Sequence, residues 1–461
     1  MKRTKQFQRL TAVLCALALT LTLSPAVFAA GETPLVSNNI NRHVGVPKVF
    51  SYLYANPRGG LTRVELMPGG ENWIVGSNGS TQVTYDPGRI VVEDYSSSYQ
   101  FVSSRTIAEE LKGCWGFFHG QQYNFLIFGQ KNPAESDSVE VIRVVKYSHD
   151  WQRLGQASVK AVDIREPFRS GAVRCAEADG QLYIHTARTM YKSSDGKNHQ
   201  SNFTLSVRES DMSYEVISSG YVSHSFDQYI LIDQQKQLAM LDLGDAYPRA
   251  VALFAKGKQY EIHEIPGPLG QNSTGVNLGG LAETANGYVA AYDRGELPKM
   301  SDGSTYTGPN ALYGGQSHAY LAYVDKSTMA VNTVRLTAER GISGVVLASY
   351  GLDGGFAMWN TRTGTDKRKN KIDEKLYYVS YDANGNVGQV KAGSAPLSDC
   401  APILYNGRLV WYVTDNSAPK FYGLDGNGVE RLDANTKPSA APLTSSAAVT
   451  PSAAPGTGLS A

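Results

Sequence analysis

Three polar segments in the middle of the chain carry most of the side chains that could take part in chemistry. They are residues 185–200, 224–228 and 244–249, and they hold three of the eight histidines. Such residues suit a sugar or another polar ligand, because His, Asp and Asn form hydrogen bonds while Tyr adds an apolar face. We predict that the ligand-binding residues are His185, Arg188, Tyr191, Asp195, His199, His224, Asp227, Asp245 and Arg249.

A structural interpretation of the same residues stays open at this stage. Buried His and Asp side chains that have hydrogen-bond partners can lock neighbouring parts of a fold together without any ligand. A catalytic triad of His224, Ser225 and Asp227 is not expected, because neighbouring residues of a strand point to opposite faces. We therefore name no catalytic residue.

Motifs of the familiar enzyme classes are missing from the sequence. It has no GxSxG, HExxH or P-loop motif and no dinucleotide-binding glycine pattern. Beyond the N-terminal segment only Cys114, Cys175 and Cys400 occur, without the spacing of a zinc site, and an odd number cannot pair fully. We expect these three cysteines to pack as small apolar residues. We predict no metal and no cofactor, and we leave open whether the protein is an enzyme.

Charge and targeting signals restrict the partners. Of 461 residues, 43 are Lys or Arg and 42 are Asp or Glu, whereas nucleic-acid binding calls for a basic excess. Residues 1–29 combine a basic start, an apolar run and small residues before a cleavage point, which is typical of a secretory signal peptide. The run is shorter than the ~20 residues of a membrane span. We therefore predict a secreted or cell-surface protein with neither a nucleic-acid partner nor a membrane span.

The rest of the chain divides into two parts. Residues 437–461 are dominated by Pro, Ala, Ser and Thr without apolar periodicity, which indicates a disordered tail. Residues 30–436 show almost no helical pattern, and turn signals such as Asn406-Gly407 separate their short apolar runs. The clearest predicted strands are Arg89–Glu93, Phe125–Phe128, Val139–Tyr147, Leu182–His185, Tyr229–Ile232, Lys375–Tyr381 and Arg408–Val413.

A repeated unit organises these strands. The segment that starts at Cys175 is similar to the one that starts at Cys400, and a looser copy starts at Cys114. Six copies are visible, and Leu61–Thr106 can hold a seventh. Radial repetition of four-stranded sheets makes a β-propeller, so we predict an all-β fold with seven four-stranded blades. Six or eight blades, or a set of β-sandwich domains, are the alternatives. We expect Lys48–Tyr54 to close the ring against the last blade.

Four strings of the sequence carry a resemblance to known proteins: YNFLIFGQKNPAESDSVEVIRVVKYSHDWQRLG, MYKSSDGKNHQSNFT, GYVSHSFDQYILID and GDAYPRAV. They resemble a group of secreted bacterial β-propeller-like proteins, mostly from Gram-positive anaerobes and without an assigned activity. The resemblance covers roughly residues 85–430, implies an extracellular location and transfers no site residues. The turn at Ser193–Gly196 also resembles the Asp-box of sialidase-like propellers, although Gln200 stands where that motif has an aromatic residue.

These observations predict an extracellular module that binds or scaffolds a glycan, a cell-wall polymer or a protein. The alternative is a glycan-active hydrolase or lyase of the sialidase-like propeller type, and a third reading is a purely structural surface component. A convergent carboxylate pair would favour a hydrolase. A shallow aromatic platform would favour binding.

Overall fold

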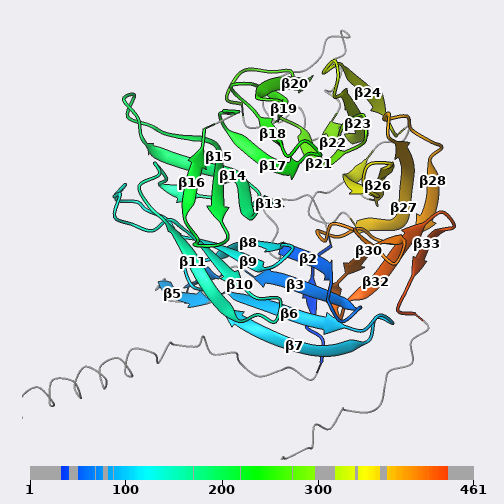
Figure 1. The fold of residues 1–461 in the computed structure, drawn as a ribbon, viewed down its shortest axis with the longest axis horizontal. Coiled ribbons are helices and arrows are strands. Elements are labelled where there is room, and N and C mark those ends of the chain that lie inside the picture. Colours follow the sequence, from blue (N-terminus) through cyan, green and yellow to red (C-terminus); the bar gives the residue numbers. More distant parts are fainter. Residues whose placement is uncertain are drawn as a thin grey trace, which may run out of the picture.

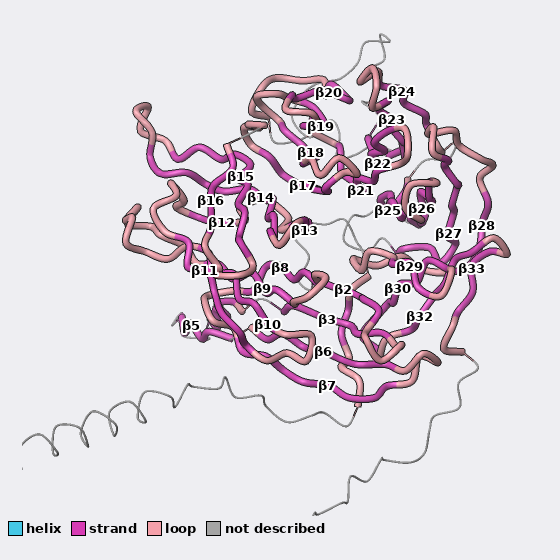
Figure 2. Tube along the Cα trace, viewed as in Figure 1, coloured by secondary structure: helices cyan, strands magenta, loops and turns pink. Residues whose placement is uncertain are grey.

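The computed structural model describes residues 33–40, 50–67, 69–75, 81–86, 88–169, 171–218, 220–271, 274–295, 317–337, 341–363 and 371–434. All regular secondary structure in these ranges is β-strand (Figures 1 and 2). No helix long and apolar enough to cross a membrane occurs in them. The predicted signal peptide, residues 1–29, and the predicted tail, residues 437–461, lie outside the described residues.

Seven antiparallel sheets stand around a common centre, so the chain is a seven-bladed β-propeller, as the repeat predicts (Figure 1). Blade 1 consists of β2 (Phe50–Ala55), β3 (Leu61–Met67), β6 (Arg89–Tyr95) and β7 (Phe101–Ala108), with the hairpin β4 (Gly70–Val75) and β5 (Thr81–Asp86) inserted between β3 and β6. Blade 2 consists of β8 (Cys114–His119), β9 (Asn124–Gly129), β10 (Ile142–Tyr147) and β11 (Arg153–Val159). Blade 3 consists of β13 (Arg174–Ala178), β14 (Gln181–Lys192), β15 (Asn198–Arg208) and β16 (Tyr214–Ile217), and the short β12 (Glu166–Pro167) pairs with the far end of β14.

The remaining blades follow the same order from the centre outward. Blade 4 consists of β17 (Ser225–Ile232), β18 (Leu238–Gly244), β19 (Ala250–Ala255) and β20 (Lys258–Glu264). Blade 5 consists of β21 (Val276–Glu283), β22 (Gly287–Gly295), β23 (Ser317–Asp325) and β24 (Val331–Arg335). Blade 6 consists of β25 (Ile342–Ser349), β26 (Gly354–Thr363), β27 (Lys371–Asp382) and β28 (Lys391–Ser394). Blade 7 consists of β29 (Ile403–Tyr405), β30 (Arg408–Val413), β32 (Lys420–Asp425) and β33 (Gly428–Arg431).

Antiparallel order gives the propeller two different faces. The hairpin turns within each blade, between its first and second and between its third and fourth strands, lie on one face, which we call the turn face. The connections from the second to the third strand and from one blade to the next lie on the other, which we call the loop face. The three polar segments singled out in the sequence therefore extend toward the loop face.

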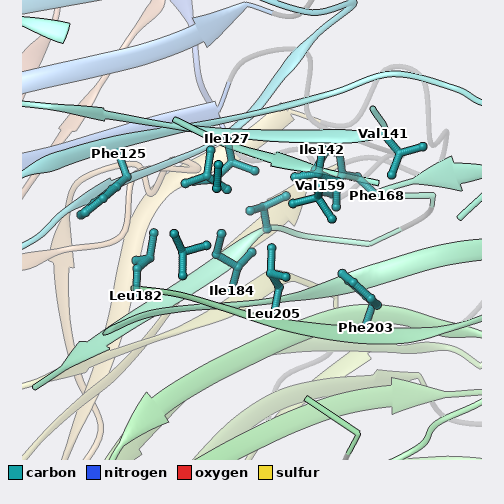
Figure 3. Packing of buried hydrophobic residues seen from close by; sticks show 14 of the residues in the cluster. Phe125, Ile127, Val141, Ile142, Val159, Phe168, Leu182, Ile184, Phe203 and Leu205 are labelled. Carbon is teal, nitrogen blue, oxygen red and sulfur yellow. The ribbon is translucent and has the colours of Figure 1, made fainter. Parts of the chain in front are cut away.

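Each blade is buried on both sides, which explains the continuous apolar runs of the sequence. In β9, Phe125 and Ile127 pack toward blade 3, while Leu126 and Phe128 pack toward blade 1, and none of the four is exposed. Alternate residues of a strand point to opposite faces, so successive positions supply different cores. Figure 3 shows the first of these cores, where β9 faces Ile184 and its neighbours on β14.

The cysteines lie at equivalent places in three blades, as the repeat predicts. Cys114 and Cys175 lie on the innermost strands β8 and β13, and Cys400 lies shortly before β29. All three are free thiols; Cys114 and Cys400 are buried, whereas Cys175 is half-buried. Burial raises the pKa of Cys175 and of Cys400 to about 12, so both stay protonated at neutral pH.

The prediction for ring closure was wrong in its position. The described part of that segment, residues 50–54, pairs with β3 and lies in β2, the innermost strand of blade 1. The closing strand is instead β1 (Ser37–Asn38), which pairs with β31 (Asp415–Ser417). Polar contacts mark this segment, with Asn39 donating to and accepting from the backbone of Thr414 (3.2 and 2.7 Å). Apolar periodicity alone could not reveal a two-residue strand held by polar side chains.

A buried ion network strengthens the same seam between blades 1 and 7. Arg63 contacts Glu65 (3.2 Å) and Glu93 (3.4 Å), and the side chains of all three residues are fully buried. Tyr412 of β30 donates to Glu65 (3.1 Å), which joins the last blade to the first. Buried charges need such partners, because an unpaired charge in the interior is strongly destabilising.

Candidate functional site

The nine residues predicted to bind a ligand lie in blades 3 and 4, but the structure separates them into distinct environments. His185, Arg188 and Tyr191 are on β14, and Asp195 and His199 are at or beside the β14–β15 turn. The others belong to blade 4 and its loops: His224, Asp227, Asp245 and Arg249.

His185 belongs to a closed network between blades 3 and 4. Its Nε2 lies 3.1 Å from Asp242 Oδ2 and its Nδ1 lies 2.9 Å from Thr204 Oγ1, and the residue has no exposed surface. Asp242 also accepts hydrogen bonds from Ser225 (2.7 Å) and Asn202 (3.0 Å). Both ring nitrogens of His185 are engaged and enclosed, so its surroundings favour the structural role. Ser225 is likewise directed to Asp242 and forms no triad with its neighbours.

Asp195 and His199 form an exposed pair at the tip of the β14–β15 hairpin. The Asp195 carboxylate accepts from Ser193 Oγ (2.6 Å), from the Lys197 backbone N–H (3.0 Å) and from His199 Nε2 (2.9 Å). These bonds, that of Ser193 first, lower the pKa of Asp195 to about 2. The bonds to Ser193 and Lys197 hold the turn of the hairpin, and the pair remains open to solvent.

Arg188 and Tyr191 are anchored to the loops that precede blade 3. Arg188 donates to the carbonyl of Val162 (2.5 Å) and lies over the ring of Phe203 (5.0 Å). The Tyr191 hydroxyl accepts from Asn132 (2.9 Å). Burial lowers the pKa of Arg188, although the guanidinium stays charged at neutral pH. Both side chains are half-buried and lie on the side of the hairpin that faces blade 2.

His224 and Asp245 form a second His–Asp pair where blades 3 and 4 meet on the loop face. His224 Nδ1 lies 3.0 Å from Asp245 Oδ1, and the side chains are 31% and 0% exposed. The contact is close but not aligned as a hydrogen bond, and among the described residues no other donor reaches either Asp245 oxygen. Burial raises the pKa of Asp245, which His224 partly offsets. No hydrogen bond or ion pair joins His224 Nε2 to a described residue, so this nitrogen is available to a ligand.

The backbone around this pair is tightly fixed. His224 has a left-handed conformation (φ 53°), which is costly for a residue with a Cβ, and its N–H donates to the carbonyl of Gln200 (2.9 Å). Arg249 donates to the carbonyls of Asp245 (3.2 Å) and Gln271 (2.6 Å), so it ties the β18–β19 loop to the loop that leaves blade 4. Arg249 thus supports the position of Asp245 rather than reaching toward solvent, since it is only 6% exposed.

Two exposed tyrosines, which the sequence prediction missed, lie close to the pair in the chain, with Tyr221 three residues before His224 and Tyr247 two residues after Asp245. Tyr221 is 55% exposed and Tyr247 is 66% exposed. Their backbones are neighbours, because the N–H of Ser223 donates to the carbonyl of Tyr247 (3.1 Å). Exposed aromatic side chains beside polar groups are typical of interaction sites. We call Tyr221, His224, Asp245 and Tyr247 the junction patch.

Asp227 lies apart from the junction patch, in a charged cluster on the innermost strands. Arg174 of β13 packs over the ring of Tyr229 (4.4 Å) and donates to its hydroxyl (3.3 Å). Burial raises the pKa of Asp227 to about 6 and that of Asp399 to about 7, whereas Arg174 lowers both. Both residues are nevertheless half-exposed, so water still reaches them. We call Arg174, Asp227, Tyr229 and Asp399 the central cluster.

The sequence held a signal for the central cluster. Arg174 and Asp399 directly precede Cys175 and Cys400, which the repeat places at equivalent positions. The residue before each core cysteine is therefore a predictable position on or near an innermost strand. No group of three or more His, Cys, Asp or Glu side chains in the described ranges could hold a metal ion.

Comparisons with known proteins find only distant similarities. No protein-family profile matches the chain, and no curated protein matches it in sequence. Among solved structures it is similar to a mutant of the Synechocystis apocarotenoid oxygenase, with a TM-score of 0.42 and 8% identity over 85% of this chain and 94% of that one. It is also similar to a mutant of the GH43 protein BlXynB from Bacillus licheniformis, with a TM-score of 0.29 and 11% identity over 67% of this chain and 65% of that one. Similarities this weak carry no functional argument.

Proposed function

We propose that this protein is an extracellular binding module that recognises a glycan through the junction patch. The extracellular location rests on the secretory signal in the sequence. The binding role rests on the composition of the patch, which combines two exposed tyrosines with the partly exposed His224. A cell-wall polymer falls within this ligand class, since its sugar rings present the same hydroxyl groups and apolar faces.

One observation carries the proposal: two exposed tyrosines, Tyr221 and Tyr247, lie in the two segments that bring His224 and Asp245 together, and His224 Nε2 has no hydrogen-bond partner in the described structure. The tyrosine rings offer apolar surface for the face of a sugar, and their hydroxyls remain wet. His224 Nε2 offers a hydrogen bond to a sugar hydroxyl. The more distant Asp195 and His199 extend the polar surface along the hairpin.

The test is a binding screen of the full-length protein against chitohexaose, cellohexaose, xylohexaose and insoluble cell-wall polysaccharide. We expect the double variant Tyr221→Ala/Tyr247→Ala to weaken binding at least about tenfold, roughly 1.4 kcal/mol. The matched control is Tyr214→Ala, which removes a tyrosine that is 37% exposed on the outer strand β16. Equal binding by all three proteins would overturn the role of the patch, and a lack of binding to every probe would overturn the glycan assignment.

A second candidate function, a glycan hydrolase, is favoured by the central cluster. A carboxyl group with a pKa near 7, such as Asp399, can hold a proton near neutrality and act as a general acid, and a second carboxylate such as Asp227 can act as base or nucleophile. Release of shorter sugars in the same screen, abolished by Asp399→Asn, would establish this activity. Retention without product release would leave the binding module as the function.

A further inference from the structure

An open groove of about 1070 Å³ lies on the turn face, at the opposite end of blade 4 from the junction patch. It is bordered by hairpin turns of blades 4, 5 and 6 and by Tyr183 of blade 3. Ligand sites commonly occupy ~300–1,000 Å³, so the groove can take a chain of several sugar rings. Much of its lining is polar: Gln235, Gln237, Lys256, Asn286, Ser327 and Asn384.

Several hydrogen-bonding groups in the groove are free to meet a ligand. The side-chain amides of Gln235 and Gln237 are exposed and bond to no described residue, although the backbone N–H of each donates to Asp233 (2.9 Å). The Tyr183 hydroxyl likewise has no partner in the described part of the chain, and its ring is half-exposed. A hydrogen-bonded turn thus places two amides in the same groove as an aromatic ring. Amides suit hydroxyl groups because each one both donates and accepts.

The charges of the groove nearly cancel. Lys236 pairs with Asp179, and Lys326 pairs with Glu283. Lys256 donates to the backbone carbonyl of Lys326 and has no acidic partner in the described structure. A strongly anionic polymer would need an uncompensated basic surface. The balance therefore favours a neutral ligand rich in hydroxyl groups.

We infer that this groove is a second carbohydrate site, which makes the protein bivalent for neutral glycan chains. The inference rests on the proposed function for the class of ligand, but it uses none of the same residues. The eight residues of β17 separate the two sites. Its first residue, Ser225, follows His224 of the patch, and its last residue, Ile232, lies three residues before Gln235 of the groove. At ~3.3 Å per residue this distance is about 25 Å. The sites face in opposite directions, so they bind two chains rather than one, and the protein bridges them.

The experiment measures the stoichiometry of chitohexaose, cellohexaose and xylohexaose on the full-length protein by titration calorimetry. The groove variant is Gln235→Ala/Gln237→Ala, and the patch variant is Tyr221→Ala/Tyr247→Ala. The control is Gln121→Ala/Gln122→Ala, which removes two exposed glutamines from the corresponding turn of blade 2. A thermal melt of each variant establishes that it is folded, which we expect because all four glutamines are exposed.

We expect two equivalents of hexasaccharide on the wild type and the control, and one on each of the other variants, with the lost site weakened at least about tenfold. One equivalent on the wild type that only the patch variant loses would overturn the second site and leave the proposed function intact. One equivalent that only the groove variant loses would support the groove and overturn the patch. No binding by the wild type would overturn both.

Discussion

Two His–Asp pairs lie at the same junction of blades 3 and 4, and they differ in how fully they are satisfied. In the first, His185 and Asp242 are 3.1 Å apart and completely enclosed. In the second, His224 and Asp245 are 3.0 Å apart, but the histidine is 31% exposed. Residue types and separation are nearly the same, so neither distinguishes a structural pair from a binding pair.

The hydrogen-bond donors around each carboxylate make the difference. Asp242 receives bonds from His185, Ser225 and Asn202, which come from three strands in two blades. Asp245 receives no aligned bond from any described residue. A satisfied buried network stabilises and rigidifies the interface, whereas an unsatisfied carboxylate costs free energy that a binding role can explain. The number of hydrogen-bond donors around the carboxylate, rather than the residue types, therefore distinguishes the structural pair His185–Asp242 from the candidate binding pair His224–Asp245.

The largest expected effect on stability comes from disrupting the hydrogen-bond network of His185 and Asp242. Asp242→Asn places an amide N–H₂ where two or three donors converge, so we expect unfolding to become easier by about 3 to 5 kcal/mol. Urea denaturation of the variant and the wild type measures this change. A loss below about 1 kcal/mol would show that the network is not what joins blades 3 and 4.

The central cluster supplies a second, smaller effect that depends on pH. The folded pKa values of Asp227 and Asp399, about 6 and about 7, lie above the unfolded value of ~3.9, so the folded state binds more protons between these limits. Stability is therefore lost as the pH rises from about 4 to 7. We expect Asp227→Asn and Asp399→Asn each to stabilise the protein by about 1 to 2 kcal/mol at pH 8 and to leave it unchanged at pH 3, after allowing for screening by water.

Thermal melts across this pH range test the predicted dependence of stability on pH. Arg174→Gln is the opposing control, because losing the guanidinium removes the charge that lowers both pKa values. It should steepen the loss of stability toward high pH. Identical pH profiles for the wild type and both Asn variants would mean that neither carboxyl group is perturbed.

The corresponding substitution in the second pair, Asp245→Asn, tests whether that pair is also structural. We expect Asp245→Asn to change the free energy of unfolding by no more than about 1 kcal/mol, because no aligned donor is lost and a buried charge is removed. Burial raises the pKa of Asp245, because the charged carboxylate is costly there. The variant should therefore be most stable relative to the wild type at high pH, where the wild-type carboxylate is charged. Urea denaturation of Asp245→Asn and Asp242→Asn in parallel compares the two pairs directly. Equal losses in the free energy of unfolding would contradict the distinction between a structural pair and a binding pair.

The smallest effect on stability is expected for His224→Gln. The side chain is partly exposed and its Nε2 forms no hydrogen bond with a described residue, so we expect the free energy of unfolding to fall by less than about 0.5 kcal/mol. Binding of the strongest hexasaccharide should nevertheless weaken several-fold, because a hydrogen bond to the ligand is altered. His185→Gln is the matched comparison: it should destabilise the protein while the folded fraction binds normally. The reverse pattern would exchange the roles of the two histidines.

The fold followed from local patterns that each blade repeats. Runs such as Phe125–Phe128 and Arg408–Val413 lie within strands β9 and β30 as predicted, because a blade buried on both sides needs apolar residues at successive positions. The closing strand was misplaced because Ser37 and Asn38 are polar and its partner is some 377 residues away in the chain. No local period could announce such a pairing.

For the candidate site, the sequence determined which segments are polar and that they follow strands of adjacent repeats, and this was enough to bring His224 and Asp245 into consideration. It did not determine which aspartate each histidine meets, because that depends on how the sheet of blade 4 stacks against blade 3. Only the tertiary structure decided that His185 is enclosed while His224 is partly open, and that Tyr221 and Tyr247 are exposed. The physical reason is that strand period and composition are local, whereas burial, donor supply and pKa arise from residues that are distant in the chain and meet only when the ring closes.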